Sequence, residues 1–245
     1  MIEMTDSQIF SNTPSPTTRP QWGGEVKSKP HIEREEQNGS QPCNVIVANG
    51  EPPAHPWVVA LLRRAAHIIC CDGAVAALEH LGLEPAVVVG DGDSLTAEQR
   101  ARYADYFEQD ASTDYNDLTK AFNYCRRHGL DNLWVVGAGG RRDDHALANL
   151  GLLVRHAREF RVCMATNFGI FTPISATTEF AAYAGQQVSV FSFTPACRLT
   201  FHGLRYPVRE RAFSELWEGS LNEALGDNFT VELCDEGEVL VYQPF

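Results

Sequence analysis

The chain has 245 residues, 44% of them hydrophobic, which is enough for one large or two small domains with a substantial core. Its 32 acidic and 20 basic residues give a formal net charge of −12. This balance argues against a nucleic-acid partner, because such binding depends on Lys and Arg that neutralise phosphates. No apolar run approaches membrane-spanning length, and the N-terminus lacks the basic and apolar regions of a signal peptide. We therefore expect a soluble, cytoplasmic protein that binds neither nucleic acid nor membrane.

Residues 1–41 differ in composition from the rest of the chain. Residues 13–20 are rich in Pro, Ser and Thr, and residues 33–36 are a charged run. Apolar residues are sparse there and show no period, so the sequence predicts a disordered tail over residues 1–41.

From Cys43 onward, strand-like and helix-like segments alternate. Short apolar runs typical of buried strands occur at residues 44–48, 68–71, 86–89, 133–136 and 161–165. Helical segments are expected between them, at residues 57–66, 74–81, 96–107, 117–128 and 145–158. This alternation predicts an α/β domain over residues 42–166, with a parallel sheet covered by helices on both faces.

The pattern changes after about Thr166. Four segments alternate with period two, at residues 187–193, 198–201, 229–233 and 239–242, and residues 235–237 form a turn between the last two. Residues 167–245 are therefore expected to form a small antiparallel β domain, a sandwich or barrel. The predicted fold is an α/β catalytic domain followed by a small antiparallel β-sandwich domain.

Four acidic clusters follow one another along the α/β domain, each where a predicted strand should end. They are Cys71-Asp72-Gly73, Gly90-Asp91-Gly92-Asp93-Ser94, Asn116-Asp117-Leu118-Thr119-Lys120 and Gly140-Arg141-Arg142-Asp143-Asp144-His145. In an open parallel sheet, ligands bind at the carboxyl ends of the strands. Carboxylates that converge there suit Mg²⁺, which prefers oxygen ligands and often shares them with substrate phosphates. The sequence thus predicts a magnesium–phosphate site.

The spacing within the clusters suggests individual roles. Asp91 and Asp93, two residues apart after a strand, can both curl over one ion in a turn, with glycines that allow close approach of a phosphate. Asp72-Gly73 begins a helix, whose N-terminus favours an anion. Asp117 and Lys120 share the first turn of a helix, where one face offers a metal ligand and a phosphate donor together.

A glycine-rich turn at residues 137–140 precedes the fourth cluster. Arg142 is suited to bidentate contact with a phosphate, while His145 and Asn149 share a helical face that could hold a nucleotide. The sequence contains no G-x-x-x-x-G-K-[ST] motif, which excludes a P-loop enzyme.

Taken in order, the four clusters resemble those of the thiamine pyrophosphokinase family. Its pattern runs D-G, G-D-x-D-S, [T/N]-D-x-T-K and G-x-x-G-x-R-x-D-H-x-x-x-N, and the resemblance covers about residues 44–243. The family transfers the β,γ-diphosphoryl group of ATP to the hydroxyl of thiamine, giving thiamine diphosphate and AMP. The resemblance implies an α/β domain, a β-sandwich domain and a homodimer with thiamine bound at the subunit interface.

The resemblance also implies roles for single residues. Asp91, Asp93 and Asp117, with Asp72 close by, would bind Mg²⁺ and handle the phosphates, and the first three would form the catalytic set with Lys120. The residues implied for ATP are Asp72, Gly73, Lys120, Arg142, Asp144 and His145.

The thiamine site implied by the resemblance lies near residues 219–223, with Ser220 and Asn222 as contacts. Leu221 stands where the family commonly has Ser. Thr113 replaces a Gln that often precedes the third motif by a few residues.

Two other functions are compatible with parts of the pattern. An aspartyl-nucleophile phosphatase also opens with an apolar strand and D-x-D, but on the first strand, whereas Asp91 and Asp93 follow about the third. A non-catalytic sensor of nucleotide or thiamine would require the loss of a catalytic carboxylate, and none is missing.

Overall fold

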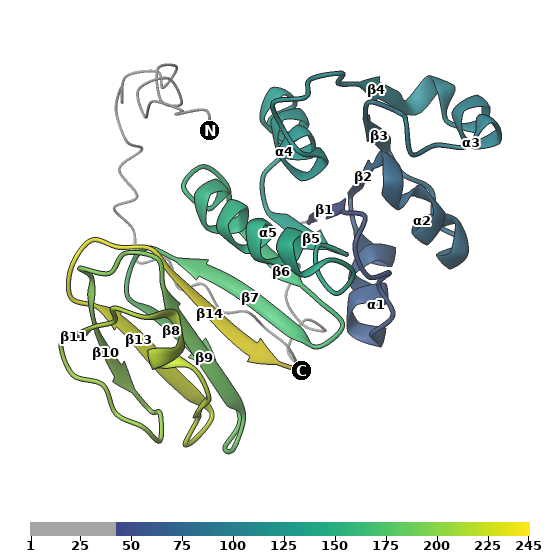
Figure 1. Cartoon of the computed structure of the whole chain (residues 1–245). Coiled ribbons are helices and arrows are strands. Elements are labelled where there is room, and N and C mark those ends of the chain that lie inside the picture. Colours follow the sequence, from purple (N-terminus) through teal and green to yellow (C-terminus); the bar gives the residue numbers. More distant parts are fainter. Residues whose placement is uncertain (1–42) are drawn as a thin grey trace, which may run out of the picture.

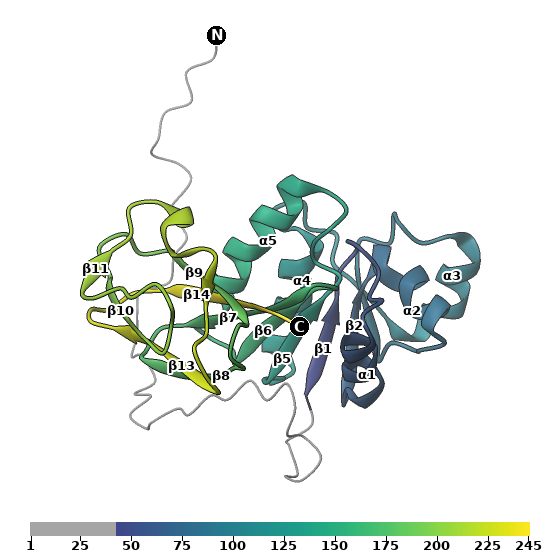
Figure 2. The same ribbon diagram turned by 90° about the horizontal axis from the view of Figure 1, so that it is seen from below.

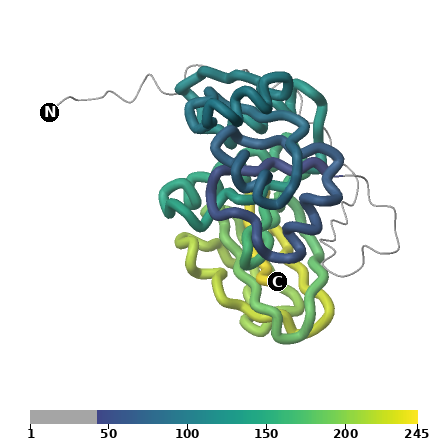
Figure 3. Tube along the Cα trace, turned by 90° about the vertical axis from the view of Figure 1, so that its right-hand side faces the viewer, coloured from purple at the N-terminus to yellow at the C-terminus, as the bar shows by residue number. Residues whose placement is uncertain are grey.

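The computed structural model describes residues 43–245 (Figure 1), so the predicted tail lies outside the described residues. No helix within this part of the chain is long and apolar enough to cross a membrane. The tube in Figure 3 shows the C-terminal strands, green to yellow, at one end of the molecule and the teal segments near residue 100 at the other.

The N-terminal domain contains six parallel strands in the order β6-β5-β1-β2-β3-β4. Their bounds are Asn44–Val47 (β1), His67–Cys71 (β2), Val87–Gly90 (β3), Phe107–Gln109 (β4), Leu133–Val136 (β5) and Val162–Ala165 (β6). β1 and β3 are buried along their whole length, because helices cover both faces of the sheet and leave no face for polar side chains. The predicted parallel α/β domain is confirmed.

Five helices and two short 3₁₀ segments connect these strands. They are Pro56–Arg64 (α1), Asp72–Ala74 (η1), Val75–Leu81 (α2), Ala97–Arg102 (α3), Ala104–Tyr106 (η2), Asp117–Arg127 (α4) and Asp143–His156 (α5). Figure 2 shows α5 and α1 on opposite sides of the strands. All the parallel strands end at one edge of the sheet, which brings together the turns that follow β1, β2, β3 and β5.

The helix predicted for residues 96–107 is shorter than expected. A capping box between Thr96 and Gln99 starts α3, which ends at Arg102, and Phe107–Gln109 instead forms β4 beside β3. This edge strand has three residues and only one apolar side chain, so no period marks it in the sequence. Its end places Asp110 next to the end of β3, where Asp110 N donates to Gly90 O at 2.8 Å.

The C-terminal domain is an antiparallel sandwich, as predicted, but one of its layers continues the parallel sheet of the N-terminal domain. β7 pairs antiparallel with β6, and the sheet then runs on through β14, β9 and β12 to give ten strands. β11, β10, β13 and β8 form the second layer. The bounds are Gly169–Ile174 (β7), Thr178–Ala181 (β8), Gln187–Ser192 (β9), Arg198–His202 (β10), Arg211–Ala212 (β11), Leu216–Gly219 (η3), Asn222–Glu223 (β12), Asn228–Leu233 (β13) and Val239–Pro244 (β14).

Buried aromatic rings fill the space between the two layers. Phe180 and Phe229 stack with ring centroids 5.0 Å apart, and Phe201 meets Phe213 edge to face at 5.9 Å. β13 and β14 belong to different layers, so the segment between them, where the sequence predicted a turn, does not close a β-hairpin.

A buried histidine makes stability depend on pH. His156 stacks on Phe122 with a centroid distance of 4.0 Å, and within the described chain neither ring nitrogen has a hydrogen-bond partner. Burial, with a smaller contribution from Arg126, lowers the pKa of His156 to about 4 from its ordinary 6.5. The unfolded chain therefore binds the proton first as pH falls, so stability present above pH 6.5 is lost progressively towards pH 4.

We expect His156 to lower the free energy of unfolding by about 3 kcal/mol over that interval. Urea unfolding at several pH values checks this, with His156→Leu as the comparison. The leucine variant should lose less stability than the wild-type chain between pH 6.5 and 4, and parallel curves for the two proteins would contradict the assignment.

Candidate active site

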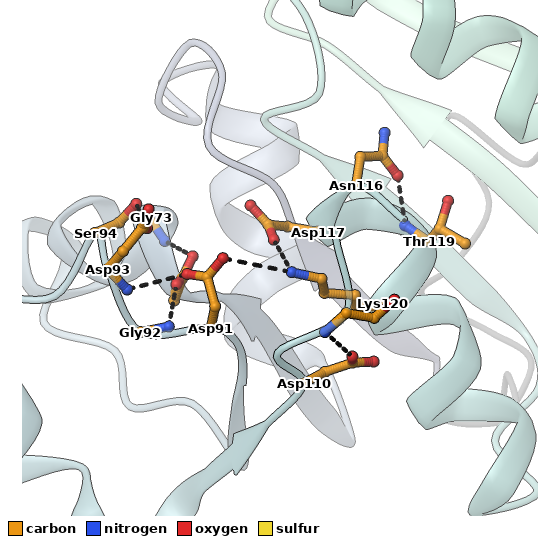
Figure 4. A network of polar contacts seen from close by, with 12 residues as sticks. Gly73, Asp91, Gly92, Asp93, Ser94, Asp110, Asn116, Asp117, Thr119 and Lys120 are labelled. Atoms are coloured by element: carbon orange, nitrogen blue, oxygen red, sulfur yellow. Dashed lines mark hydrogen bonds and ion pairs between the residues drawn. The ribbon is translucent and has the colours of Figure 1, made fainter. Parts of the chain in front are cut away.

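Three carboxylates from two strand ends meet at the carboxyl edge of the sheet, and Figure 4 shows two of them, Asp91 and Asp93. Asp72 follows β2, while Asp91 and Asp93 follow β3, and one oxygen from each lies within 4.8 Å of the others. Three hard oxygen donors at this separation match the ligands that Mg²⁺ prefers. The pairing of β2 with β3 thus brings together two of the sequence clusters in one candidate cation site.

Asp72 is the buried member of the cluster, with 2% of its surface exposed. Its Oδ1 accepts a hydrogen bond from Gly73 N at 2.6 Å, and its Oδ2 accepts one from Gly92 N at 2.9 Å. Burial raises the pKa of Asp72, and the hydrogen bond from Gly92 opposes that rise. The hydrogen bond from Gly92 to Asp72 therefore connects the turn after β3 with the end of β2.

Asp91 and Asp93 form the exposed side of the cluster. Gly92 between them has φ +81°, a left-handed conformation that glycine adopts without strain. Asp93 N donates to Asp91 Oδ1 at 3.0 Å, which is the main reason that the pKa of Asp91 is lowered, and Lys120 adds to it. Ser94 Oγ donates to Asp93 Oδ1 at 3.1 Å. Both carboxylates thus face solvent where a ligand can approach.

Gly90 leaves no room for a side chain beside Asp72. A Cβ on Gly90 would lie 2.4 Å from Asp72 Cγ and 2.6 Å from its Oδ2. We expect Gly90→Ala to displace Asp72, to cost roughly 1–3 kcal/mol through overpacking, and to lower turnover sharply. The matched control is Gly151→Ala in α5, where an added Cβ meets nothing within 4 Å.

Turnover and thermal melting of these two alanine variants test the prediction. Activity in Gly90→Ala equal to that in Gly151→Ala would mean that Asp72 has no part in the reaction.

A buried lysine lies beside the carboxylates. Asn116 caps α4 by accepting from Thr119 N at 3.0 Å, and this helix start presents Asp117 and Lys120 to the cluster. Lys120 Nζ lies 3.2 Å from Asp117 Oδ1 and 3.7 Å from Asp91 Oδ2, with 3% of the side chain exposed. Burial alone would lower the pKa of Lys120, but the hydrogen bond and charge of Asp117 outweigh it and raise the pKa.

Asp117 therefore lies against the ammonium of Lys120, and the group of three converging carboxylates does not include it. The lysine itself is the only one between residues 43 and 245, since the sequence has three, at positions 27, 29 and 120.

The fourth cluster lies at the start of α5, after β5. Arg142 donates to Asp144 through Nε at 3.1 Å and through Nη2 at 2.6 Å, which lowers the pKa of Asp144. Both side chains and His145 are exposed, so they are free to meet a ligand at this helix N-terminus. Asn149 does not point to such a ligand: it is buried, and its amide donates to Ala138 O at 2.8 Å, which fixes the glycine-rich turn instead.

A cavity of about 240 Å³ lies between the glycine-rich turn and the start of β7. Its walls are mostly apolar and come from the loop after β1, the glycine-rich turn, α5, the β6–β7 turn and β14. Residues 137–140, Met164, Phe171 and Tyr242 are among those that line it. The cavity therefore lies beside the glycine-rich turn, and none of the three carboxylates of the cluster lines it.

Sequence reasoning missed three residues at this edge. Asn49 follows β1 and its Oδ1 accepts from Arg141 Nη1 at 2.9 Å; its side chain also packs against Gly73. Glu51 lines the cavity. Asp110 follows β4, and its negative charge contributes to the raised pKa of Lys120. Asn49 could have been found from its position after the strand at 44–48, whereas Asp110 needed β4 to be recognised.

Ser220 and Asn222 lie far from the carboxylates in the same chain. β12 is the outermost strand of the sheet, eight strand positions from β3, roughly 38 Å at the usual spacing. Asn222 is buried: its Oδ1 accepts from Tyr206 N at 3.0 Å and its Nδ2 donates to Tyr206 O at 2.8 Å. Ser220 Oγ donates to Trp217 O at 2.7 Å.

Two family models match consecutive parts of the chain. Residues 58–164 match the catalytic domain of thiamin pyrophosphokinase, and residues 169–242 match its substrate-binding domain. The chain belongs to the thiamin pyrophosphokinase family. The predicted family and the activity of a thiamine diphosphokinase are confirmed by these matches, and nothing favours the phosphatase or the sensor.

Solved thiamin pyrophosphokinases share the fold. The Bacillus subtilis protein has a TM-score of 0.71 at 20% identity, over 82% of this chain and 98% of its own. The Candida albicans protein has a TM-score of 0.72 at 16% identity, over 82% and 90%. The yeast protein has a TM-score of 0.69 at 16% identity, over 86% and 88%. No match to this sequence was found among curated proteins.

Proposed function

We propose that the cluster of Asp72, Asp91 and Asp93, with Lys120 beside it, is where this chain transfers the diphosphoryl group of ATP to thiamine. The observation that carries this proposal is the convergence of three carboxylate oxygens within 4.8 Å next to a buried ammonium. Acidic ligands recruit a cation, and the fixed ammonium attracts phosphate, so the two together suit a metal-bound polyphosphate.

Mg²⁺ is the metal that we propose for the cluster. Asp91 and Asp93 are exposed. Each oxygen of Asp72, Asp91 and Asp93 that accepts a hydrogen bond keeps a further lone pair for a cation. Bound there, Mg²⁺ would neutralise charge on the phosphate oxygens. Asp117 is proposed to act beside this cluster, since it already holds Lys120 in place.

ATP is proposed to lie along the carboxyl edge of the sheet, from β3 towards β5. The turns after these strands are three strand positions apart, roughly 14 Å. The polyphosphate would extend from Lys120, Asp72 and Gly73 towards Arg142, and the nucleoside end would lie beside Asp144 and His145. The exposed N-terminus of α5 and its arginine favour an anionic ligand.

In the proposed reaction, the primary hydroxyl of thiamine attacks the β-phosphorus of ATP in line, and AMP leaves. The protein contributes position and charge, as in other phosphoryl transfers. Lys120 lies where it can balance negative charge on the transferred group. The carboxylates that flank Lys120, Asp91 and Asp117, are our proposed acceptors for the hydroxyl proton.

We propose a homodimer with thiamine bound between subunits, received by the segment of Ser220 and Asn222. This segment cannot reach the carboxylates of its own chain across eight strand positions. It also exposes large apolar side chains, with Trp217 70% and Leu221 71% exposed, as expected of a surface that a partner covers.

Subunit mixing tests the dimer. An Asp91→Asn chain and a Trp217→Ala chain, each impaired alone, should regain activity when they exchange subunits, because one site per heterodimer is intact. A monomer in sedimentation, or no recovery despite proven exchange, would rule out the shared site.

A cytoplasmic location is also proposed. Four of the seven cysteines are buried free thiols, as is usual in a reducing compartment.

Product analysis tests the proposed function. Incubation with ATP, Mg²⁺ and thiamine should give AMP and thiamine diphosphate in equal amounts. Release of phosphate without thiamine would favour the phosphatase, and binding of either substrate without turnover would favour the sensor.

A further inference from the structure

The turn between β6 and β7 holds a loop of the catalytic domain through a single amide. Asn167 Oδ1 accepts hydrogen bonds from Ala54 N at 2.8 Å and from His55 N at 3.1 Å. Its Nδ2 donates to Pro52 O at 3.0 Å. One side chain at the junction of the two domains thus bonds three backbone groups within residues 52–55, which lie 112 to 115 residues away in sequence.

The other end of the same loop is fixed to the glycine-rich turn. Gly50 N donates to Gly137 O at 2.6 Å, and Glu51 N donates to Gly139 O at 2.7 Å. A Cβ on Gly50 would lie 2.4 Å from Gly137 O, so the two backbones are in direct contact. A shift of the loop must therefore shift the glycine-rich turn, which leads into α5.

The loop and the turn are two walls of the 240 Å³ cavity, and Asn167 is a third contributor to its lining. The β6–β7 turn has its own internal support, because Thr166 Oγ1 accepts from Phe168 N at 3.1 Å and Gly169 N at 3.3 Å. Removal of the Asn167 amide would therefore loosen residues 52–55, leaving the stack of His55 on Phe245 as a remaining contact there, while the turn that carries Asn167 keeps its shape.

We propose that Asn167 is a positioning residue for ATP: it sets the loop at residues 50–55, and through it the glycine-rich turn, so that the cavity receives the nucleoside part of ATP. This inference rests on the proposed function. Asn167 contacts neither the carboxylate cluster nor Lys120, which lie at the ends of β2, β3 and the start of α4. Its loss should weaken the binding of ATP and leave the chemical step and thiamine binding largely intact.

The test compares three variants. Asn167→Ala should raise the KM for ATP about tenfold, equivalent to about 1.4 kcal/mol, with kcat and the KM for thiamine within about twofold of wild type. Asn167→Asp keeps both acceptor bonds to Ala54 N and His55 N but sets a carboxylate oxygen against Pro52 O, so it should recover only part of the lost affinity.

Asn44→Ala is the matched control, because Asn44 also links segments that are distant in sequence, at the opposite end of β1. Its Nδ2 donates to Asp131 O at 2.7 Å and its Oδ1 lies 2.9 Å from His67 Nδ1. This variant should lose stability without a change in the KM for ATP.

An unchanged KM for ATP in Asn167→Ala, or equal increases for ATP and thiamine, would overturn the proposal and leave Asn167 a purely structural role. Calorimetry of ATP with Mg²⁺ separates this outcome from failure of the proposed function. If the wild-type chain binds ATP but makes no thiamine diphosphate, the proposed function is wrong. The role of Asn167 is then still tested by comparing the ATP dissociation constants of Asn167→Ala and the wild-type chain. A wild-type chain that does not bind ATP overturns both.

Discussion

Asp91→Asn should lower kcat by a factor on the order of 10² to 10³ while the protein stays folded. The amide oxygen of Asn can still accept from Asp93 N, so the turn after β3 keeps its main hydrogen bond. What is lost is an anionic oxygen that faces both the candidate cation site and Lys120. The effect should therefore fall on the reaction and on the metal requirement.

The control for Asp91→Asn is Asp105→Asn, the same chemical change at an exposed position in η2. Formation of thiamine diphosphate at several Mg²⁺ concentrations, with thermal melting in parallel, measures the two variants. If Asp91→Asn works at a near wild-type rate at ordinary Mg²⁺ concentration, the candidate cation site is misassigned.

Lys120→Met should have an effect of similar size, a loss in turnover on the order of 10² to 10³. Methionine fills a similar volume and bends readily, so the buried space that Lys120 occupies stays filled. The ammonium between Asp91 and Asp117 disappears, which leaves the acidic residues of the site without their fixed cation. ATP should then bind more weakly, because its phosphates meet uncompensated carboxylates.

Arg63→Met is the control for this change, since Arg63 is an exposed cation in the last turn of α1. Calorimetric titration with ATP measures the ATP affinity of the two variants, and an assay of thiamine diphosphate formation measures their turnover. Turnover and ATP affinity in Lys120→Met that match those in Arg63→Met would remove Lys120 from the site.

The convergence of Asp72, Asp91 and Asp93 could be predicted from the sequence because it depends on one rule. Apolar runs mark buried parallel strands, parallel strands end at a common edge, and residues that follow neighbouring strands must then lie close together. The rule needs no knowledge of loop shape. It also accounts for the position of Lys120 beside Asp91, since a helix start after that edge faces the same way, whereas Asp117, predicted as a metal ligand, lies against Lys120 and outside the group of three carboxylates.

Contacts made by loops could not be predicted in the same way. Arg141 reaches Asn49 across 92 residues, and Asn167 reaches Ala54 across 113, through loop conformations that no period in the sequence marks. Buried amides raise a related difficulty. Asn149 and Asn222 stand among residues of functional motifs, and their side chains bond backbone atoms of their own chain, a contact that the sequence does not reveal.

Isotope transfer tests the central claim most directly, that diphosphoryl transfer occurs at the carboxylate cluster. Wild-type protein is given thiamine, Mg²⁺ and ATP labelled with ³²P at either the γ- or the α-phosphate. The account predicts that the γ-label enters thiamine diphosphate and the α-label appears in AMP, and that Asp91→Asn suppresses the formation of both labelled products together. A γ-label recovered in thiamine monophosphate or free phosphate, or full transfer by Asp91→Asn, would contradict it.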